Sequence, residues 1–220
     1  MRTIAVVLFI LLFGLTTRLY AKTIQVFGKW KVGENLLENS GFEDDTNAWT
    51  LEDGAGGDRN CVISWAIEKK NPHLGKKCLY LKCDKVSGTD WHAKVRQDSS
   101  SMKSGKTFTI AFYALAEKPR AVSISVQMQH DPWTFYQGGN ISLESGEWKQ
   151  YSHTFTATAD VVNDMWVGLA IAQNAVNFWL DDFRFWEGDL KDELEPPGGK
   201  TDASVNPTGK LAAIWSQIKQ

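Results

Sequence analysis

The fold of this chain is decided by Asn35-Leu36-Leu37-Glu38-Asn39-Ser40-Gly41-Phe42-Glu43, a stretch that Trp49 follows. Its counterpart near the other end reads Phe178-Trp179-Leu180-Asp181-Asp182-Phe183. Each stretch sets large apolar residues beside acidic ones, and most of the chain lies between them. The length of the chain and its 43% hydrophobic content suit one folded domain with extensions.

Between these stretches, apolar residues alternate with polar ones as they do in half-buried β-strands. Residues 107–115 and 122–128 show the pattern most clearly. The residues on the inward side are Phe108, Ile110, Phe112 and Ala114 in the first segment and Val122, Ile124, Val126 and Met128 in the second.

Further strands are predicted over residues 61–67, 77–83, 148–156, 165–172 and 176–186, with turn signals between them. No helical periodicity interrupts this run. The sequence therefore predicts an all-β fold.

The two quoted stretches resemble the opening and closing strands of the carbohydrate-binding modules of families 4, 9, 16 and 22. In those modules the first and last strands lie side by side. The resemblance therefore implies a two-sheet jelly-roll β-sandwich, galactose-binding-like in arrangement, over residues 34–187. It also implies non-catalytic binding of a polysaccharide, in the role of an accessory module to glycoside hydrolases.

The N-terminal residues 1–21 have a different composition from the rest. Arg2 precedes an apolar run that is too short to span a bilayer, and a small-residue cleavage pattern ends at Ala21. This order is typical of a secretory signal peptide. We expect cleavage to leave a secreted or cell-surface protein without a membrane segment; an uncleaved membrane anchor is the alternative.

The C-terminal residues also differ from the central domain. Residues 188–209 are rich in charge, Pro and Gly, and they predict a flexible linker. Residues 210–220 are an amphipathic segment, whose apolar residues fall on one helical face. That segment could dock on a partner or on the sandwich, or could be a frayed tail. The apolar residues are Leu211, Ile214, Trp215 and Ile218.

The composition argues against some ligands. The chain has 24 basic and 26 acidic residues, a net charge of −2 and no basic block, so nucleic acid is not expected as a partner. Its 10 tryptophans are unusual. An exposed indole face matches the apolar face of a sugar ring, although most of these residues are expected in the core.

The cysteines fall on two predicted strands, 61–67 and 77–83. A hairpin centred on Pro72 would set Cys61 opposite Cys83 on the inward side and would turn Cys78 to the other side. We therefore predict that Cys61 and Cys83 can form a disulfide after export and that Cys78 is the odd thiol.

The ligand-binding residues are expected on the outward side of two strands. In residues 122–129 the outward side chains are small hydroxyls followed by amides, which offer donors and acceptors to sugar hydroxyls. In residues 165–172 the outward side chains are small and leave room for a ligand. The first set is Ser123, Ser125, Gln127 and Gln129, and the second is Gly168, Ala170 and Ala172.

Aromatic side chains would form the walls of this groove. Tyr113 alternates outward on its strand, and Trp133 and Tyr136 follow the amide-bearing strand directly. The alternative for Trp133 and Phe135 is that they cap the end of the sandwich. With such walls, we predict a shallow groove on one sheet that binds a β-linked glucan or xylan chain.

The resemblance to family 22 adds two candidates. Trp91 stands where those modules carry a stacking Trp. Those modules also carry an outward Glu on the strand that corresponds to residues 165–172, which this chain lacks, and Gln173 is the nearest replacement.

The resemblance further implies a structural Ca²⁺ between the first and last strands. The matching carboxylates are Glu43 and Asp181, with Asp182 as the alternative if the strand bulges; the carbonyls of Gly41 and Lys77 are further candidates. A hard cation takes such oxygen ligands, whereas two carboxylates brought together without a cation repel each other. The other interpretation is that these are surface carboxylates at strand ends.

Catalysis is not expected from the outward residues. A glycosidase needs two carboxyl groups roughly 5 to 9 Å apart across its site, and the outward sets contain none. The histidines show neither a zinc-binding spacing nor a neighbouring nucleophile motif. Two alternative functions are left open: an adhesion or display sandwich without sugar affinity, and a small polysaccharide-cleaving enzyme.

Overall fold

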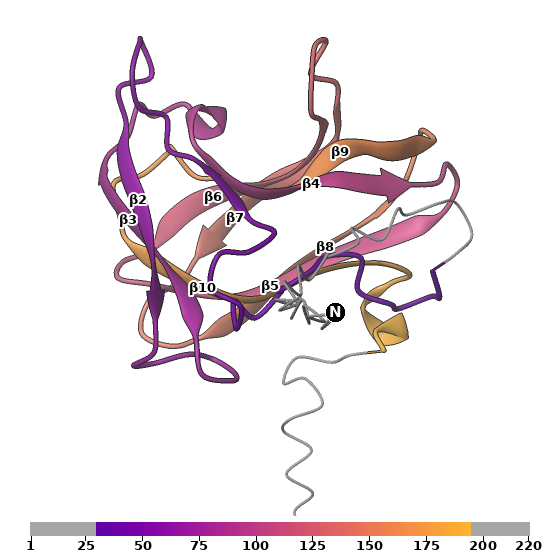
Figure 1. The fold of residues 1–220 in the computed structure, drawn as a ribbon, viewed down its shortest axis with the longest axis horizontal. Coiled ribbons are helices and arrows are strands. Elements are labelled where there is room, and N and C mark those ends of the chain that lie inside the picture. Colours follow the sequence, from indigo (N-terminus) through magenta and orange to yellow (C-terminus); the bar gives the residue numbers. More distant parts are fainter. Residues whose placement is uncertain (1–29, 195–220) are drawn as a thin grey trace, which may run out of the picture.

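The computed structural model describes residues 30–194, which form two five-stranded antiparallel β-sheets packed face to face (Figure 1). The predicted all-β jelly-roll sandwich is confirmed. No helix in this range is long and apolar enough to cross a membrane. The predicted signal peptide 1–21 and C-terminal segment 210–220 lie outside the described residues.

Sheet A has the strand order β1-β4-β9-β6-β7, and sheet B has the order β2-β3-β10-β5-β8. Two short 3-10 helices, η1 (Asp90–His92) and η2 (Leu190–Asp192), accompany them. The strands of sheet A are β1 (Thr50–Glu52), β4 (Lys94–Met102), β6 (Arg120–Met128), β7 (Phe135–Leu143) and β9 (Val161–Ala170). The strands of sheet B are β2 (Val62–Glu68), β3 (Cys78–Lys85), β5 (Thr107–Ala116), β8 (Lys149–Thr156) and β10 (Phe178–Glu187).

The core lies between the sheets and is built by the alternation that the sequence shows. The predicted inward residues of β5 and β6 are fully buried, except Met128 at the end of β6, which is only half-buried. Each large apolar side chain buried in this way contributes roughly 1.5 to 3 kcal/mol relative to an exposed one. The alternation therefore also fixes which side chains point outward from each sheet.

Residues 35–43 and 178–183 lie side by side. Leu36 N–H donates to the carbonyl of Phe185 at 2.7 Å, and Phe183 N–H donates to that of Ser40 at 2.9 Å. The buried ring of Trp49 meets Phe183 edge-on, with ring centroids 5.4 Å apart. The N-terminal stretch is thus attached to the last strand, as the resemblance implied.

Strand β10 contains a β-bulge between Asp181 and Arg184, where Asp182 has a φ of 55°. A bulge shifts the alternation by one residue. Leu180 and Phe183 therefore both face the core, while Asp181 lies on the other side of the sheet among the residues of the 69–77 loop.

Strands β2 and β3 pair in a different register from the one predicted. Ile63, not Cys61, lies opposite Cys83, and Trp65 lies opposite Leu81, so the pairing is displaced by two residues. The predicted placement of Cys61 opposite Cys83 is therefore wrong, and all three cysteines of the chain are free and buried.

The connection between these strands explains the displacement. Residues 69–77 do not form a symmetric turn at Pro72, because the Asp181 carboxylate accepts the N–H groups of His73 and Leu74. Cys78 does turn away from the core, but its Sγ lies 4.0 Å from the carbonyl of Asn71 in this loop. Burial raises the pKa of the Cys78 thiol to about 12, so Cys78 is an inert buried thiol.

The folded domain extends beyond residue 187, where the linker was predicted to begin. Thr109 donates to the carbonyl of Gly188 at 2.7 Å, and Arg184 forms an ion pair with Glu193. Asp189 and Asp192 form a capping box around η2. These contacts hold residues 188–194 against sheet B, so the predicted linker 188–209 begins too early.

Candidate functional site

The outer face of sheet A, the side turned away from sheet B, carries the hydroxyl and amide side chains predicted for ligand binding. Val122, Ile124 and Val126 of β6 are buried in the core. The residues between them therefore point to the outer face, as predicted.

Strand pairing arranges the outward residues of sheet A in rows that cross the strands. Adjacent strands lie about 4.8 Å apart, so a row across all five strands spans about 19 Å. The rows are Glu52-Lys94-Ala170-Ser123-Asn140, Thr50-Arg96-Gly168-Ser125-Gly138 and Trp166-Gln127-Phe135.

The middle of these rows is recessed. Ser123 and Ser125 are each only 6% exposed and Ala170 is 1% exposed, although all three lie on the outside of the sheet. Gly168 is required here, because a Cβ atom at this position would lie 2.2 Å from the carbonyl oxygen of Val95 on β4. Larger side chains around this floor provide the surface that a ligand would meet.

One such side chain is the amide of Gln173. Its Nε2 donates to Ser123 Oγ at 2.8 Å and to Asn140 Oδ1 at 3.3 Å, while Ser123 Oγ donates to Asn140 Oδ1 at 2.6 Å. The Gln173 Oε1 atom is buried and has no hydrogen-bond partner among the described residues. The network is therefore incomplete at one acceptor.

Two loops rise beside the outer face of sheet A, on the side away from sheet B: the indigo loop between β1 and β2 and the salmon loop between β6 and β7 (Figure 1). The helix η1 lies against the first loop, and its Trp91 side chain is 49% exposed. The Arg59 guanidinium lies over the Trp91 ring, 5.5 Å from its centroid, and His92 meets the ring edge-on. Trp91 is thus an exposed aromatic residue held on one face by a cation.

The second loop joins β6 to β7 and carries Trp133, which is 54% exposed; Phe135, at the start of β7, is 58% exposed. Gln127 Nε2 donates to the Trp133 carbonyl at 2.7 Å and so ties the loop to the floor. His130 Nε2 lies 3.0 Å from Asp164 Oδ2 at the base of the same loop. The hydrogen bond to the Asp131 carbonyl and the Asp164 carboxylate raise the pKa of His130.

Charged residues occupy the β1 and β4 side of the outer face. Glu52 pairs with Lys94 at 3.0 Å and with Arg96 at 2.8 Å, and Asp98 pairs with Arg96. Lys94 and Arg96 both lie over the ring of Trp166, which is buried. These charges compensate one another, so this part of the face is close to neutral.

The structure brings four of the predicted ligand residues to this face: Trp91, Trp133, Gln127 and Gln173. Gln129 is engaged elsewhere, because its Oε1 accepts the N–H of Ser99 at 2.9 Å. Tyr136 is partly buried and packs against the core.

Tyr113 is not part of this face. It belongs to β5 of sheet B, and His73 stacks on its ring with centroids 3.6 Å apart. The sequence pattern correctly turned Tyr113 away from the core, but alternation cannot tell which of two sheets a strand joins. Phe135 was missed as an exposed neighbour of Trp133, because Trp133 and Phe135 were interpreted together as possible caps.

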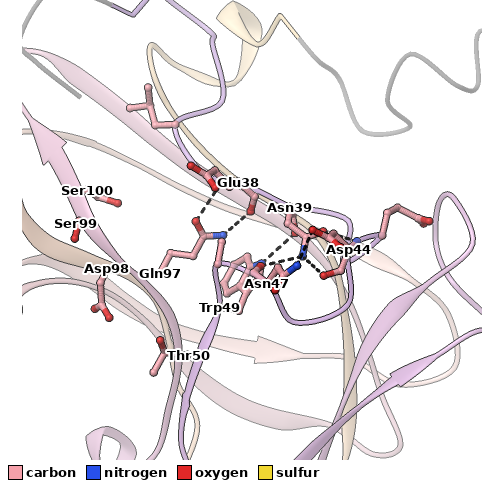
Figure 2. A pocket seen from close by; sticks show the side chains of 13 residues that line it. Glu38, Asn39, Asp44, Asn47, Trp49, Thr50, Gln97, Asp98, Ser99 and Ser100 are labelled. Atoms are coloured by element: carbon pink, nitrogen blue, oxygen red, sulfur yellow. Dashed lines mark hydrogen bonds between the residues drawn. The ribbon is translucent and has the colours of Figure 1, made fainter. Parts of the chain in front are cut away.

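A separate pocket of about 730 Å³ lies between the N-terminal stretch and β4 (Figure 2). Gln97 fixes one wall, since its amide exchanges two hydrogen bonds with the backbone of Glu38. Asn39 fixes another, because its side chain accepts the N–H of Asp44 and donates to the Asn47 carbonyl. These hydrogen bonds order two walls of the pocket, but Trp49 presents no exposed ring to it.

The predicted calcium ligands Glu43 and Asp181 both hold the 69–77 loop. Glu43 Oε1 accepts the N–H groups of Lys76 at 2.6 Å and Lys77 at 3.1 Å. Asp181 Oδ2 accepts those of His73 at 2.9 Å and Leu74 at 3.1 Å.

Whether a cation fits here depends on the surroundings of the second carboxylate oxygen of Asp181. Asp181 Oδ1 is buried without a hydrogen-bond partner among the described residues, and a Cβ atom on Gly41 would lie 3.7 Å from it. Burial raises the pKa of Asp181 to about 7. A buried, unpaired carboxylate oxygen fits a cation ligand, whereas Asp182 pairs with Arg184 instead. Within residues 30–194, no group of three or more His, Cys, Asp or Glu side chains is gathered as a metal site.

Comparison with known families agrees with this architecture. The sequence profile of a family described as carbohydrate binding domain, which covers families 4 and 9, matches residues 34–169. The chain belongs to this family. A polysaccharide is accordingly the class of ligand that membership implies. No curated protein matches the sequence significantly.

Solved carbohydrate-binding modules share the fold. A family 4 module is 22% identical, with a TM-score of 0.58 over 69% of this chain and 99% of that one. The xylan-binding family 22 module of Paenibacillus barcinonensis Xyn10C is 15% identical, with a TM-score of 0.51 over 72% and 97%. A putative sugar binding protein from Bacteroides thetaiotaomicron is 14% identical, with a TM-score of 0.54 over 70% and 100%.

Proposed function

We propose that this carbohydrate-binding domain is non-catalytic and binds a β-linked glucan or xylan chain along the outer face of sheet A. The observation that carries the proposal is the placement of two exposed tryptophans, Trp91 and Trp133, on loops at this face. Exposed aromatic residues beside a polar surface mark binding sites, because sugar rings stack on indole faces while their hydroxyls need hydrogen-bond partners.

Each element of the face has a role in this proposal. Trp91 stacks a sugar ring on the side opposite Arg59, and Trp133 with Phe135 supports the chain at the other loop. The Gln173 amide orders the side chains of Ser123 and Asn140, and the exposed Asn140 amide offers hydrogen bonds to the sugar. The near-neutral charge of the face suits an uncharged polysaccharide.

The non-catalytic part of the proposal rests on the carboxylates of the same face. Glu52 and Asp98 are both engaged in ion pairs with cations on β4. A general acid and base must be available to exchange protons with the substrate. Carboxylates engaged in this way serve to order the face instead.

Calorimetric titration of residues 22–220 with xylohexaose and cellohexaose tests this function. Binding to at least one hexaose is expected, and Gln173→Leu should weaken it because the apolar side chain removes the amide from the Ser123 and Asn140 network. Release of reducing ends from xylan or β-glucan is measured in parallel. Failure to bind either hexaose would favour the adhesion function, and release of reducing ends would favour the hydrolase.

We also propose that Glu43 and Asp181 hold a structural Ca²⁺, with the carbonyls of Gly41 and Lys77 as further ligands. The support is the buried, unpaired Oδ1 of Asp181. A cation that binds only the folded state raises the melting temperature by mass action. Calcium should therefore raise, and a chelator lower, the melting temperature of the wild type but not of Asp181→Ala; an unchanged wild-type curve would remove the proposal.

Export is proposed from residues 1–21. The support is the order of basic, apolar and small residues in that segment. N-terminal sequencing of protein recovered from the outside of the expressing cell should begin at Lys22, whereas a start at Met1 would indicate an uncleaved anchor.

A further inference from the structure

The outer face of sheet B presents an uninterrupted apolar row across four strands. The row, named here the sheet B row, consists of Ala66, Tyr80, Trp179 and Leu115, which pair in this order across β2, β3, β10 and β5. The rings of Tyr80 and Trp179 are in contact, with centroids 5.0 Å apart. All four side chains remain at least partly exposed.

Other parts of this face are covered by the chain itself. The 69–77 loop covers the next row, where His73 stacks on Tyr113 and the Asn71 carbonyl contacts Cys78. Residues 188–194 cover the opposite end, through the pairing of Arg184 with Glu193. The sheet B row lies beyond the reach of both segments and keeps its apolar surface.

Acidic residues surround the sheet B row. Burial raises the pKa of Tyr80, and the charges of Glu117, Glu68 and Asp84 raise it further, whereas Lys82 lowers it. Lys82 and Asp84 pair with each other at 2.7 Å. Glu117 accepts hydrogen bonds from the neutral Asn177 amide. The surroundings therefore carry a net negative charge.

We propose that residues 210–220 of the same chain dock along the sheet B row as a short amphipathic helix. This segment has Leu211, Ile214, Trp215 and Ile218 at the spacing of one helical face. Its only charged side chains are Lys210 and Lys219, which complement the acidic surroundings of the row. A lone helix of this length is marginal in water, so its formation requires an apolar surface on which to pack.

Length and position agree with this docking. Eleven residues of helix extend about 16 Å, close to the roughly 14 Å that three strand spacings give between Ala66 and Leu115. The described chain ends at Leu194 on the same face of sheet B, where Leu194 N–H donates to the Gly33 carbonyl. Residues 195–209 can span up to about 50 Å when extended, which exceeds the roughly 30 Å length of β10.

Paramagnetic relaxation in the full mature chain tests the docking. A nitroxide placed on Gln220→Cys labels a single site, because the native cysteines are buried. The amide signals of Ala66, Tyr80 and Trp179 should lose intensity, while those of Ser125 and Gly168 on sheet A should keep theirs. This docking is independent of sugar binding, so either proposal can fail alone.

The matched control is the same labelled chain with Trp215→Ser and Ile218→Ser, which alters only the tail and leaves the sandwich untouched. The proposal requires the lost intensity to return in this variant. Equal loss over both sheets, or none, would overturn it. Signal loss in an unlabelled chain that is mixed with labelled chains, without loss inside the labelled chain itself, would show that a second copy occupies the sheet B row. If xylohexaose restored the lost intensity and shifted the signals of Tyr80 and Trp179, sugar would be the occupant. Either result would contradict the proposal.

Discussion

The two outer faces of the sandwich are both rich in aromatic residues, but they use them differently. On sheet A, Trp91 and Trp133 lie on loops and expose about half of their side chains. On sheet B, Tyr80 packs on Trp179, and Tyr113 lies beneath His73. We therefore base the proposed ligand site on the position of the aromatic residues, on loops beside a polar floor, and not on their number.

The floors of the two faces differ in the size of their outward side chains. Sheet A has Gly168, Ala170 and serines at its centre, so a ligand can approach the backbone closely. Sheet B has large side chains and the carboxylate of Asp181 at the equivalent depth, and the 69–77 loop covers them. The small residues of sheet A leave its backbone open to a ligand, whereas the large residues beneath the 69–77 loop hold that loop in place.

The largest effect is expected from filling the floor of sheet A. Gly168→Ala would set a Cβ atom 2.2 Å from the Val95 carbonyl oxygen and 2.7 Å from Arg96 Cα, so β4 and β9 must separate. We expect a loss of about 3 kcal/mol or more in the free energy of unfolding. Gly139→Ala is the matched control on β7, since nothing lies within 4 Å of a Cβ there. Equal denaturation midpoints for the two variants would show that the close approach is not needed.

Much of the fold followed from the sequence, because β5 and β6 place apolar residues at every second position. Strands β1, β4 and β7 were missed. The segment that forms β4 is Lys94-Val95-Arg96-Gln97-Asp98-Ser99-Ser100-Ser101-Met102. Its charges lie on the outer face, and Ser100 and Ser101 are buried at its irregular end. In β7, Gly138 and Gly139 interrupt the alternation.

The candidate site was predictable only in part. Alternation placed Gln127 on the outer face, and the resemblance placed Trp91 and Gln173 there, because both signals apply to single residues. Tyr113 was misplaced, since assigning a strand to one of two sheets requires pairing partners far away in the sequence. The register of β2 and β3 failed for a related reason: Asp181, more than 100 residues away, holds the loop between them.

The next effect concerns the carboxylate that holds the sheet B loop. Asp181→Ala leaves the N–H groups of His73 and Leu74 without their acceptor, so the free energy of unfolding should fall by about 1 to 3 kcal/mol. Asp45→Asn removes an exposed ion pair with Lys77 and keeps a residue type that tolerates the left-handed φ of 51° at this position, so it should cost less than about 1 kcal/mol. Urea denaturation compares the two, and a larger loss for Asp45→Asn would contradict this ranking.

Removing a tryptophan should weaken sugar binding on one face and leave it unchanged on the other. Trp91→Ala should weaken hexaose binding by about 1 to 3 kcal/mol, the range for one aromatic anchor, without lowering the melting temperature. Trp179→Ala should leave hexaose affinity unchanged, since the ring lies on sheet B. Calorimetry on both variants measures the difference, and the reverse pattern would transfer the site to sheet B.

The smallest effect is a pH dependence of the Trp133 loop. The folded pKa of His130 is raised by the Asp131 carbonyl and by Asp164, so its stabilising contribution is complete below the ordinary pKa of about 6.5 and is lost as the pH rises through the raised value. Hexaose affinity should therefore decline modestly from weakly acidic to weakly basic pH. Asp164→Asn should flatten this profile, and an equally steep profile in that variant would exclude the pair as its cause.

The central claim is that the ligand lies on sheet A, and chemical-shift mapping during a hexaose titration tests it most directly. Binding on sheet A should shift the signals of the indole N–H groups of Trp91 and Trp133 and of the side-chain amide of Gln173. The signals of Tyr80 and Trp179 should not move. Shifts confined to Tyr80 and Trp179, or to the residues that line the pocket beside Asn39, would contradict it.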